Sequence, residues 1–211
     1  MSFYSDEKYA KKQRDEDLWF ERLYFKRWFG GITGPILDVG CATGNFMAVK
    51  PEIFEGVEID EKSVNIAKSR GFKVFKLDVE KEMSTLASEK YEAVFAKQVI
   101  EHLKDPLAFL LQTRRILKNG GKAVILTPNC PYVLNKMFWD DYTHQRPFTR
   151  KSLKMLAYDA GFKDTKIYED FRCFWGLGRL MRWFNLPPET VSKLQRVFFI
   201  RGLSLILVLK K

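Results

Sequence analysis

The chain has 211 residues, of which 46% are hydrophobic and 29% are charged, and its formal net charge is +10 at pH 7. This length supports one sizeable hydrophobic core, and this composition excludes a disordered chain. No apolar run reaches the roughly 20 residues that a membrane-spanning helix needs. Residues 1–17 are charged and lack the apolar centre of a signal peptide. We therefore expect one globular domain.

The cysteines and the charge distribution indicate the cellular compartment and the kind of partner. Cys41, Cys130 and Cys173 are odd in number and widely spaced, which favours reduced thiols in a cytoplasm. Residues 145–211 hold 14 basic and 5 acidic residues, so nearly all the excess charge lies in the last third. A basic face favours an anionic partner such as a phosphate, a nucleic acid or a membrane surface, although it also suits an ordinary soluble surface.

Residues 1–30 form the first unit that the sequence predicts. Leu18, Trp19, Leu23 and Trp28 recur with helical spacing. We expect a lead-in helix that packs on the domain, with a lid over a cofactor pocket as the alternative. Gly30 ends this helix, and residues 31–211 form the domain itself.

The stretch Pro35–Asn45 organises the rest of the chain. Ile36–Val39 is an apolar run typical of a buried parallel strand, and Gly40–Gly44 is a glycine loop. This loop lacks the G-x-G-x-x-G pattern of dinucleotide sites, and Asp38 precedes it. A carboxylate here suits a positively charged ligand, so the ammonium and sulfonium of S-adenosyl-L-methionine (AdoMet) fit it. The alternative is a plain strand-to-helix turn.

Strands and helices alternate through the middle of the chain. The pattern predicts strands at Phe54–Ile59, Phe72–Leu77, Tyr91–Ala96 and Lys122–Leu126, and helices at 45–49, Glu61–Ser69, 80–90 and 107–118, the last closed by Asn119-Gly120-Gly121. This alternation indicates a doubly wound α/β fold with a parallel sheet. Ligands of such sheets bind at the carboxyl ends of the strands, where Asp38, Glu58, Asp78 and residues 98–102 all fall.

The last third predicts a helix at 151–160 and strands at Asp164–Tyr168 and Leu203–Leu209. The unbroken apolar character of Leu203–Leu209 fits a strand inside the sheet. Between the two strands, residues 171–202 form a basic, aromatic helical insert. This insert can lie in a membrane interface, cap an acceptor pocket or pack on the sheet. As a cap, its arginines would favour a phosphorylated or lipid-linked acceptor.

Five motifs in order support a family resemblance: Ile36–Gly44, Gly56–Glu58, Leu77-Asp78, Val99–His102 and Leu117–Gly121. Together they resemble class I AdoMet-dependent methyltransferases of the type 11/23 methyltransferase-domain group. The resemblance implies a Rossmann-like, seven-stranded sheet whose last strand is antiparallel. It also implies AdoMet as the cofactor.

The resemblance assigns expected roles to single residues. Asp38, Gly40 and Gly44 would contact the methionine end of AdoMet, and Ala42 stands where the family usually has a third glycine. Lys97 would offer its backbone carbonyl to the methionine ammonium. Glu58 would bind the ribose, and Asp60 is the alternative acid for this role. Asp78 would bind the adenine amino group. The complete set of predicted cofactor residues is Asp38, Gly40, Cys41, Ala42, Gly44, Glu58, Ile59, Asp78, Val79 and Lys97.

Three further residues are candidates for the chemistry, because oxygen acceptors must lose a proton. His102 and His144 are the two histidines of the chain, and His144 lies in the loop after the fifth strand. We predict His144 as general base or acceptor ligand, with His102 and Glu101 at the same pocket. The alternative is that His144 orders its own loop.

A metal is the competing interpretation of these residues. Gln98, Glu101 and His102 have the spacing of one helical face. With His144 they resemble the Glu-x-x-Glu-His site, plus a distant His, of small-RNA 2′-O-methyltransferases. Gln98 stands where the first glutamate belongs, so we predict no metal and expect Glu101 and His102 to orient the loop.

These observations predict an AdoMet-dependent O-methyltransferase of a small molecule such as a sugar, a glycolipid or a quinone precursor. The loop 140–149 resembles that of methyltransferases of surface-polysaccharide pathways. We expect a cytoplasmic protein with peripheral membrane contact through residues 171–202. One alternative is an RNA 2′-O-methyltransferase, although no separate RNA-binding domain is visible. Another is a non-catalytic AdoMet-binding partner protein. The oligomeric state stays open.

Overall fold

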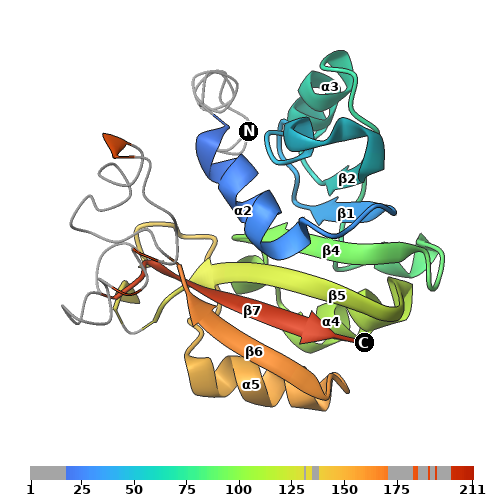
Figure 1. Cartoon of the computed structure of the whole chain (residues 1–211). Helices are drawn as coiled ribbons and strands as arrows, with labels where there is room; N and C mark the ends of the chain where they lie inside the picture. Colours follow the sequence, from blue (N-terminus) through green and yellow to red (C-terminus); the bar gives the residue numbers. More distant parts are fainter. Residues whose placement is uncertain are drawn as a thin grey trace.

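The computed structural model describes residues 18–130, 132–134, 138–170, 183–184, 190, 193 and 201–211. Within them, seven strands form one sheet with the order β3-β2-β1-β4-β5-β7-β6 (Figure 1). The strands are β1 Ile36–Val39, β2 Phe54–Glu58, β3 Val74–Lys76, β4 Tyr91–Lys97, β5 Leu117–Pro128, β6 Asp164–Glu169 and β7 Ser204–Lys210.

The first five strands run parallel, and β7 is antiparallel between β5 and β6. Ile36 of β1 pairs with Phe54 of β2 and with Ala93 of β4. Val208 of β7 pairs with Val124 of β5 and with Lys166 of β6, in both cases antiparallel. The predicted Rossmann-like, doubly wound sheet with an antiparallel last strand is therefore confirmed. The apolar run of β7 is explained by its position inside the sheet, where most of its side chains are buried.

Four α-helices accompany the sheet in the part of the chain that the structure describes: α2 Trp19–Phe29, α3 Glu61–Ser69, α4 Pro106–Ile116 and α5 Arg150–Asp159. Side-chain caps explain where three of them begin. Asp60 accepts a hydrogen bond from the Ser63 N–H before α3, and Asp105 caps α4 in the same way. Thr149 and Ser152 form a reciprocal capping box at α5.

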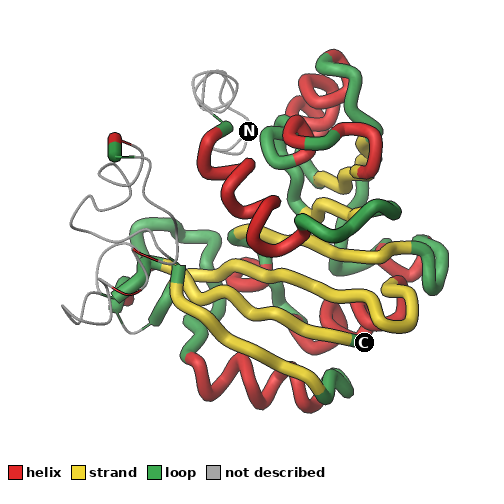
Figure 2. Tube along the Cα trace, in the orientation of Figure 1, coloured by secondary structure: helices red, strands yellow, loops and turns green. Residues whose placement is uncertain are grey.

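Helices cover both faces of the sheet (Figure 2). The core on one face joins Leu37 and Val39 of β1 with Leu110 of α4 and Leu153 of α5. The core on the opposite face joins Ile36 with residues of α2 and α3. Because side chains alternate along β1, Asp38 lies on the same face as Ile36.

Helix α2 packs against the domain through aromatic side chains. Tyr24, Trp28 and Phe29 are buried, and the Phe29 ring meets the Phe95 ring edge-on at 5.7 Å. The Tyr24 hydroxyl donates a hydrogen bond to the buried carboxylate of Asp170, just after β6. This bond therefore ties α2 to the end of β6, the strand at one edge of the sheet.

Two predicted helices are wrong. Residues 80–90 contain one 3-10 turn, η4 Met83–Thr85, rather than a helix. The Glu82 N–H bonds back to the Asp78 carbonyl, and the Glu82 carboxylate accepts from the Asp78 N–H. This closed turn, together with the absence of apolar periodicity, prevents a helix. Residues 45–49 likewise give only the 3-10 turn η2 Met47–Val49, and Pro51 opens a separate turn, η3 Pro51–Ile53.

The predicted glycine stop after α4 is also wrong. The helix ends at Ile116, and Leu117 already pairs with Tyr91 of β4. The register then shifts, so that Lys122 pairs with Ala93 and the intervening residues form a bulge. Gly120 lies in this bulge with φ +77°. Its glycine pair therefore allows an irregular strand rather than ending a helix.

Most of the predicted insert at 171–202 lies outside the described residues. Its predicted cap, membrane or packing role is therefore not described by the structure. Among the residues that the structure describes, none of the helices has the length and apolar character needed to span a bilayer.

Candidate active site

The glycine loop after β1 has a left-handed backbone at both of its glycines. Gly40 and Gly44 have φ of +66° and +84°, a region that side chains other than glycine rarely adopt. A Cβ on Gly40 would lie 2.6 Å from Val99 Cγ2, and a Cβ on Gly44 would lie 2.4 Å from the Phe72 ring. Conformation and space therefore both require glycine at these two positions.

Ala42 and Glu58 hold this loop against the end of β2. Ala42 also has a positive φ, +47°, and its N–H donates to Glu58 Oε2 at 2.9 Å. The other oxygen of Glu58 accepts from the Ile59 and Asp60 N–H groups at 2.8 and 3.0 Å. The Glu58 carboxylate is thus fixed at the carboxyl end of β2. Asp60 caps α3 instead, which separates the roles of the two acids.

Asp38 is a buried carboxylate, 3% exposed. Burial raises its pKa to about 8, the nearby Lys97 opposes this rise, and Glu58 adds to it. A carboxylate held out of water favours a cationic partner, because pairing lowers the cost of its charge. The site therefore suits the ammonium that AdoMet carries at its methionine end.

Ile59, Asp78 and Val79 lie along the neighbouring strand ends. Ile59 follows Glu58 and is 61% exposed despite its apolar side chain. The Asp78 pKa is lowered by its hydrogen bond and ion pair with Lys81 at 2.9 Å. An exposed aliphatic side chain and an ionised carboxylate are residue types suited to an adenine ring and its amino group.

The Cys41 side chain points away from solvent. It is buried in the core, and its Sγ would lie 2.6 Å from a Cβ built on Gly56. Burial, with Asp38 and Glu58 nearby, raises the pKa of this thiol. Cys41 would therefore serve a ligand through its backbone alone.

The structure brings Glu101, His102 and His144 together. Glu101 and His102 lie in the 3-10 turn η5 Ile100–His102, and His144 lies in the loop between β5 and α5. The two imidazole ring centroids are 4.6 Å apart. One nitrogen of each histidine and one Glu101 oxygen all lie within 4.8 Å of one another.

Backbone hydrogen bonds fix the second loop on the first. The Gln145 and Arg146 N–H groups both donate to the Glu101 carbonyl, at 2.9 and 3.1 Å. The Gln145 side chain also donates to the His102 carbonyl at 2.9 Å. The cluster therefore sits on two loops that are bonded to each other.

Glu101 is the most buried member of this cluster, with no exposed surface. Its Oε2 accepts a hydrogen bond from Thr127 Oγ1 at 3.1 Å, whereas its Oε1 has no hydrogen-bond partner among the described residues. Burial raises its pKa to about 8. The pKa of His102 is lowered by burial and by the neighbouring His144. These shifts favour the protonated acid of Glu101 and the uncharged imidazole of His102.

Gln98 does not share a helical turn with Glu101 and His102, so the expected helical face is wrong. It has φ +56° and ends the strand pairing by donating its N–H to the Leu126 carbonyl at 2.9 Å. The regular turn begins only at Ile100. The spacing of 98, 101 and 102 therefore does not reflect a helix.

Val99 connects the two halves of the site. Its side chain packs where a Gly40 Cβ would lie, and it precedes η5 directly. The glycine loop and the Glu101–His102–His144 cluster therefore lie at the same carboxyl edge of the sheet. Sequence reasoning missed Thr127, Asp141 and Thr143, whose hydrogen bonds hold the cluster, because no spacing rule marks such partners.

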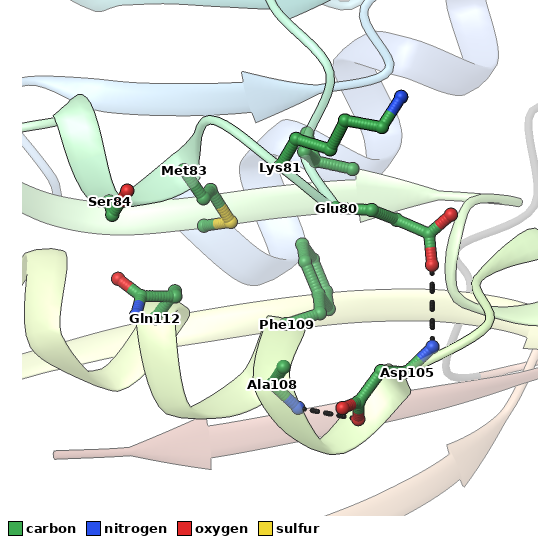
Figure 3. A pocket seen from close by; sticks show the side chains of 9 residues that line it. Glu80, Lys81, Met83, Ser84, Asp105, Ala108, Phe109 and Gln112 are labelled. Carbon is green, nitrogen blue, oxygen red and sulfur yellow. Dashed lines mark hydrogen bonds between the residues drawn. The ribbon is translucent and has the colours of Figure 1, made fainter.

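A separate small cavity of about 190 Å³ lies between η4 and α4 (Figure 3). Its lining includes Val79 and Phe109, but neither Asp38 nor Glu58. Glu80 at its rim accepts hydrogen bonds from the Lys104 and Asp105 N–H groups at 2.6 and 3.3 Å. Its acidic groups are thus used by the protein's own backbone, and this cavity is not the predicted cofactor site.

Comparison with known proteins identifies the family. A family profile described as a methyltransferase domain matches residues 12–167, which is most of the chain. The chain belongs to this methyltransferase-domain family. The predicted class I methyltransferase family and enzyme class are therefore confirmed, and the comparisons support AdoMet as the cofactor.

Three relatives show how far the similarity extends. An uncharacterised protein of Methanocaldococcus jannaschii is 26% identical over 76% of this chain and 82% of its own length. A probable AdoMet-dependent methyltransferase of Mycobacterium tuberculosis is 28% identical over 71% of this chain, but the match spans only 57% of that protein. Ubiquinone biosynthesis O-methyltransferase of a Ruegeria species is 30% identical over 48% of this chain and 43% of its own length.

Solved structures share the fold. An AdoMet-dependent methyltransferase from Archaeoglobus fulgidus superposes with a TM-score of 0.73 at 24% identity, covering 98% of this chain and all of that chain. Phosphoethanolamine N-methyltransferase 2 of Haemonchus contortus, in complex with AdoMet, gives a TM-score of 0.69 at 19% identity, covering 92% of this chain and 52% of that one.

Proposed function

We propose that the protein is an AdoMet-dependent methyltransferase that transfers the methyl group to a hydroxyl oxygen of a small molecule. The observation that carries this proposal is the Glu101–His102–His144 cluster at the carboxyl edge of the sheet. An oxygen acceptor must lose a proton, and this cluster holds the proton acceptors that such a reaction needs. The similarity to ubiquinone biosynthesis O-methyltransferases supports an oxygen acceptor.

The cofactor would be held by the loop and the strand ends already described. Asp38 and the Lys97 carbonyl would hold the methionine ammonium, and Gly40 and Gly44 would allow the backbone to approach it. Glu58 would accept hydrogen bonds from the ribose hydroxyls. Ile59, Asp78 and Val79 would contact the adenine. This arrangement would leave the sulfonium methyl facing the acceptor, since ligands of such sheets lie across the strand ends.

When bound, AdoMet supplies an activated methyl group. The acceptor oxygen would form the new C–O bond as the C–S bond breaks, with the electron pair of that bond left on sulfur. His144 or His102 would take the hydroxyl proton, so that S-adenosylhomocysteine, the methyl ether and a protonated imidazole would balance the reaction. The remaining task of the protein is alignment, which can contribute several orders of magnitude in rate.

The acceptor that suits the chain is a sugar, a glycolipid or a quinone precursor, with an anionic or lipid-linked group. The last third carries the excess of positive charge, which would attract such an acceptor. Peripheral membrane contact through residues 171–202 and a cytoplasmic location belong to the same proposal. The two described cysteines outside this insert, Cys41 and Cys130, are free thiols, consistent with a reducing compartment.

The test begins with isothermal titration of AdoMet into the wild type, Asp38→Ala and Glu58→Ala. Wild-type binding that either variant largely loses is the expected result. The wild type, His144→Ala and His102→Ala are then each incubated with radiolabelled AdoMet and a panel of hydroxylated sugars, lipid-linked sugars and catechols. Methyl ethers formed by the wild type and lost in His144→Ala support the proposal.

Two results would overturn it. Tight AdoMet binding without transfer to any member of the panel would indicate a non-catalytic binding partner. Transfer to RNA with strong salt dependence would indicate an RNA methyltransferase instead.

A further inference from the structure

We propose that Glu101, His102 and His144 bind a divalent transition metal of the zinc type, which would hold the acceptor hydroxyl. The inference deepens the proposed function and rests on the same site. It reverses the expectation from the sequence, because the structure assembles a ligand set that does not need Gln98. Three features of the cluster carry it: the histidine tautomers, the buried carboxylate and the spacing of the ligand atoms.

Hydrogen bonds fix the tautomer of His144. Its Nδ1 lies 2.6 Å from the Phe138 carbonyl oxygen, and a carbonyl can only accept, so Nδ1 carries the proton. In a neutral ring the lone pair is then on Nε2. The position of His144 on its loop thus presents Nε2 as a ligand atom.

The same argument applies to His102 through a hydroxyl. Thr143 Oγ1 donates its one proton to Asp141 Oδ1 at 2.6 Å, so it accepts from His102 Nδ1 at 2.9 Å. His102 Nδ1 therefore carries the proton, and Nε2 carries the lone pair. Metal-binding histidines in proteins are usually oriented by such a bond from the second nitrogen to a carbonyl or carboxylate. His144 has such a bond to a carbonyl, whereas His102 reaches the Asp141 carboxylate through the Thr143 hydroxyl.

Glu101 supplies the anionic ligand. Its side chain is fully buried, and Oε1 has no hydrogen-bond partner among the described residues. An unsatisfied buried carboxylate oxygen is costly, and a cation beside it would remove that cost. Thr127 holds the other oxygen, so the orientation of the carboxylate is set by the protein.

The spacing allows one ion to reach all three groups. Three ligand atoms around a tetrahedral zinc at about 2.0–2.2 Å lie about 3.3 Å apart. The ligand atoms here all lie within 4.8 Å of one another, so rotamer shifts of about 1 Å would close the set. Two imidazoles and one carboxylate leave a fourth position open, as in catalytic zinc sites. An acceptor hydroxyl bound there would have its pKa lowered. With both Nε2 atoms on the metal, its proton would leave to water instead of passing to an imidazole.

Nuclear magnetic resonance tests the metal without using activity. The chain contains only two histidines, so ¹⁵N-histidine spectra of tag-free, metal-stripped protein show two imidazoles. We expect both as Nδ1–H tautomers. Adding Zn²⁺ should shift both Nε2 signals at one equivalent. Glu101→Gln should weaken Zn²⁺ binding strongly, and Thr143→Val by roughly 10- to 100-fold, which is typical of outer partners.

Control measurements make the result decisive. Asp164→Asn changes an exposed carboxylate on β6 and should leave the Zn²⁺ affinity unchanged. Co²⁺ substituted for Zn²⁺ should give visible bands without a thiolate charge-transfer band, which excludes binding by cysteine. Unshifted histidine signals, Nε2–H tautomers, or equal Zn²⁺ affinity in wild type and Glu101→Gln would overturn the inference.

The failure of the metal and the failure of the proposed function are distinguishable. AdoMet is titrated into the same metal-stripped protein. If AdoMet binds and Zn²⁺ does not shift the histidines, the metal inference fails while the methyltransferase assignment keeps its support. If Zn²⁺ shifts both histidines but no hydroxylated acceptor is methylated, the metal stands and the proposed oxygen chemistry fails.

Discussion

Replacing Asp38 by asparagine separates stability from cofactor binding. Burial raises the native pKa of Asp38 from 3.8 to about 8, so the native state binds a proton that the unfolded state releases. Stability is therefore lost as the pH rises from about 4 to 8. Each pKa unit corresponds to about 1.4 kcal/mol, so a rise of about four units sets an upper limit on the order of 5 kcal/mol. Asparagine is neutral and escapes this loss.

Urea unfolding at pH 5, 7 and 8.5 measures the effect. The free energy of unfolding of Asp38→Asn, relative to that of the wild type, should increase with pH. We expect an increase of at least about 1 kcal/mol between pH 5 and pH 8.5. Asp164→Asn, an exposed carboxylate on β6, should show no such trend. A stability difference that stays flat or falls with pH would refute the assignment of Asp38 as a desolvated acid.

Asp38→Asn should also lose the stabilisation that bound AdoMet gives to the native state. Saturating AdoMet should raise the melting temperature of the wild type, because a ligand that binds only the native state stabilises it. In Asp38→Asn the rise should largely disappear, although the unliganded variant is the more stable protein at alkaline pH. An unchanged AdoMet-dependent rise would show that the carboxylate does not hold the cofactor.

Three further changes test the fold around the site. Gly44→Ala forces a Cβ to 2.4 Å from the Phe72 ring at φ +84°, so calorimetry should show a loss of about 1–3 kcal/mol and titration a weaker AdoMet affinity. Tyr24→Phe removes the donor to buried Asp170 and should cost about 1–3 kcal/mol in urea unfolding. Burial acts to raise the pKa of Glu55. Hydrogen bonds from Lys73, Lys90 and Tyr91 outweigh this effect and lower the pKa from 4.5 to about 2. Glu55→Gln should therefore destabilise the protein at pH 7, with the difference narrowing from about pH 4.5 to pH 2.

The sheet was predictable because its signals are local. Each central strand is a short apolar run bounded by turn residues, and the glycine loop follows β1 directly. The helix over Glu61–Ser69 agrees to the residue, because Asp60 and the following periodicity mark its start. The sheet order could be expected only through the family resemblance, since no local pattern reveals which strands become neighbours.

The errors arose where tertiary contacts override local preference. Leu117 had the apolar character of a helix end, but pairing with Tyr91 recruits it into β5. Residues 80–90 looked helical by polarity alone, yet the bond network of Asp78 and Glu82 closes a tight turn. Gln98 has helical spacing to Glu101 and His102 in the sequence, but Gln98 itself is not helical and the turn begins only at Ile100.

The candidate site was predictable in its residue types but not in its connections. His102 and His144 are 42 positions apart in the sequence, and their proximity depends on where two loops meet. The bonds from Gln145 and Arg146 to the Glu101 carbonyl decide this meeting. Thr143 and Asp141, which set the His102 tautomer, carry no sequence signal because hydroxyls and carboxylates are common in loops.

We expect cofactor binding and acceptor choice to be encoded in different parts of this chain. Asp38 lies near the end of β1, Glu58 is the last residue of β2 and Asp78 comes shortly after β3, and these parallel strands place them regardless of the acceptor. The cluster that would meet the acceptor depends instead on the β5–α5 loop, docked on Glu101 through backbone groups that any sequence supplies. Loop side chains can therefore vary while the docking persists, so similarity over the strands transfers the reaction class but not the substrate. It follows that exchanging residues 140–149 between relatives should change the acceptor preference and leave the AdoMet affinity as it was.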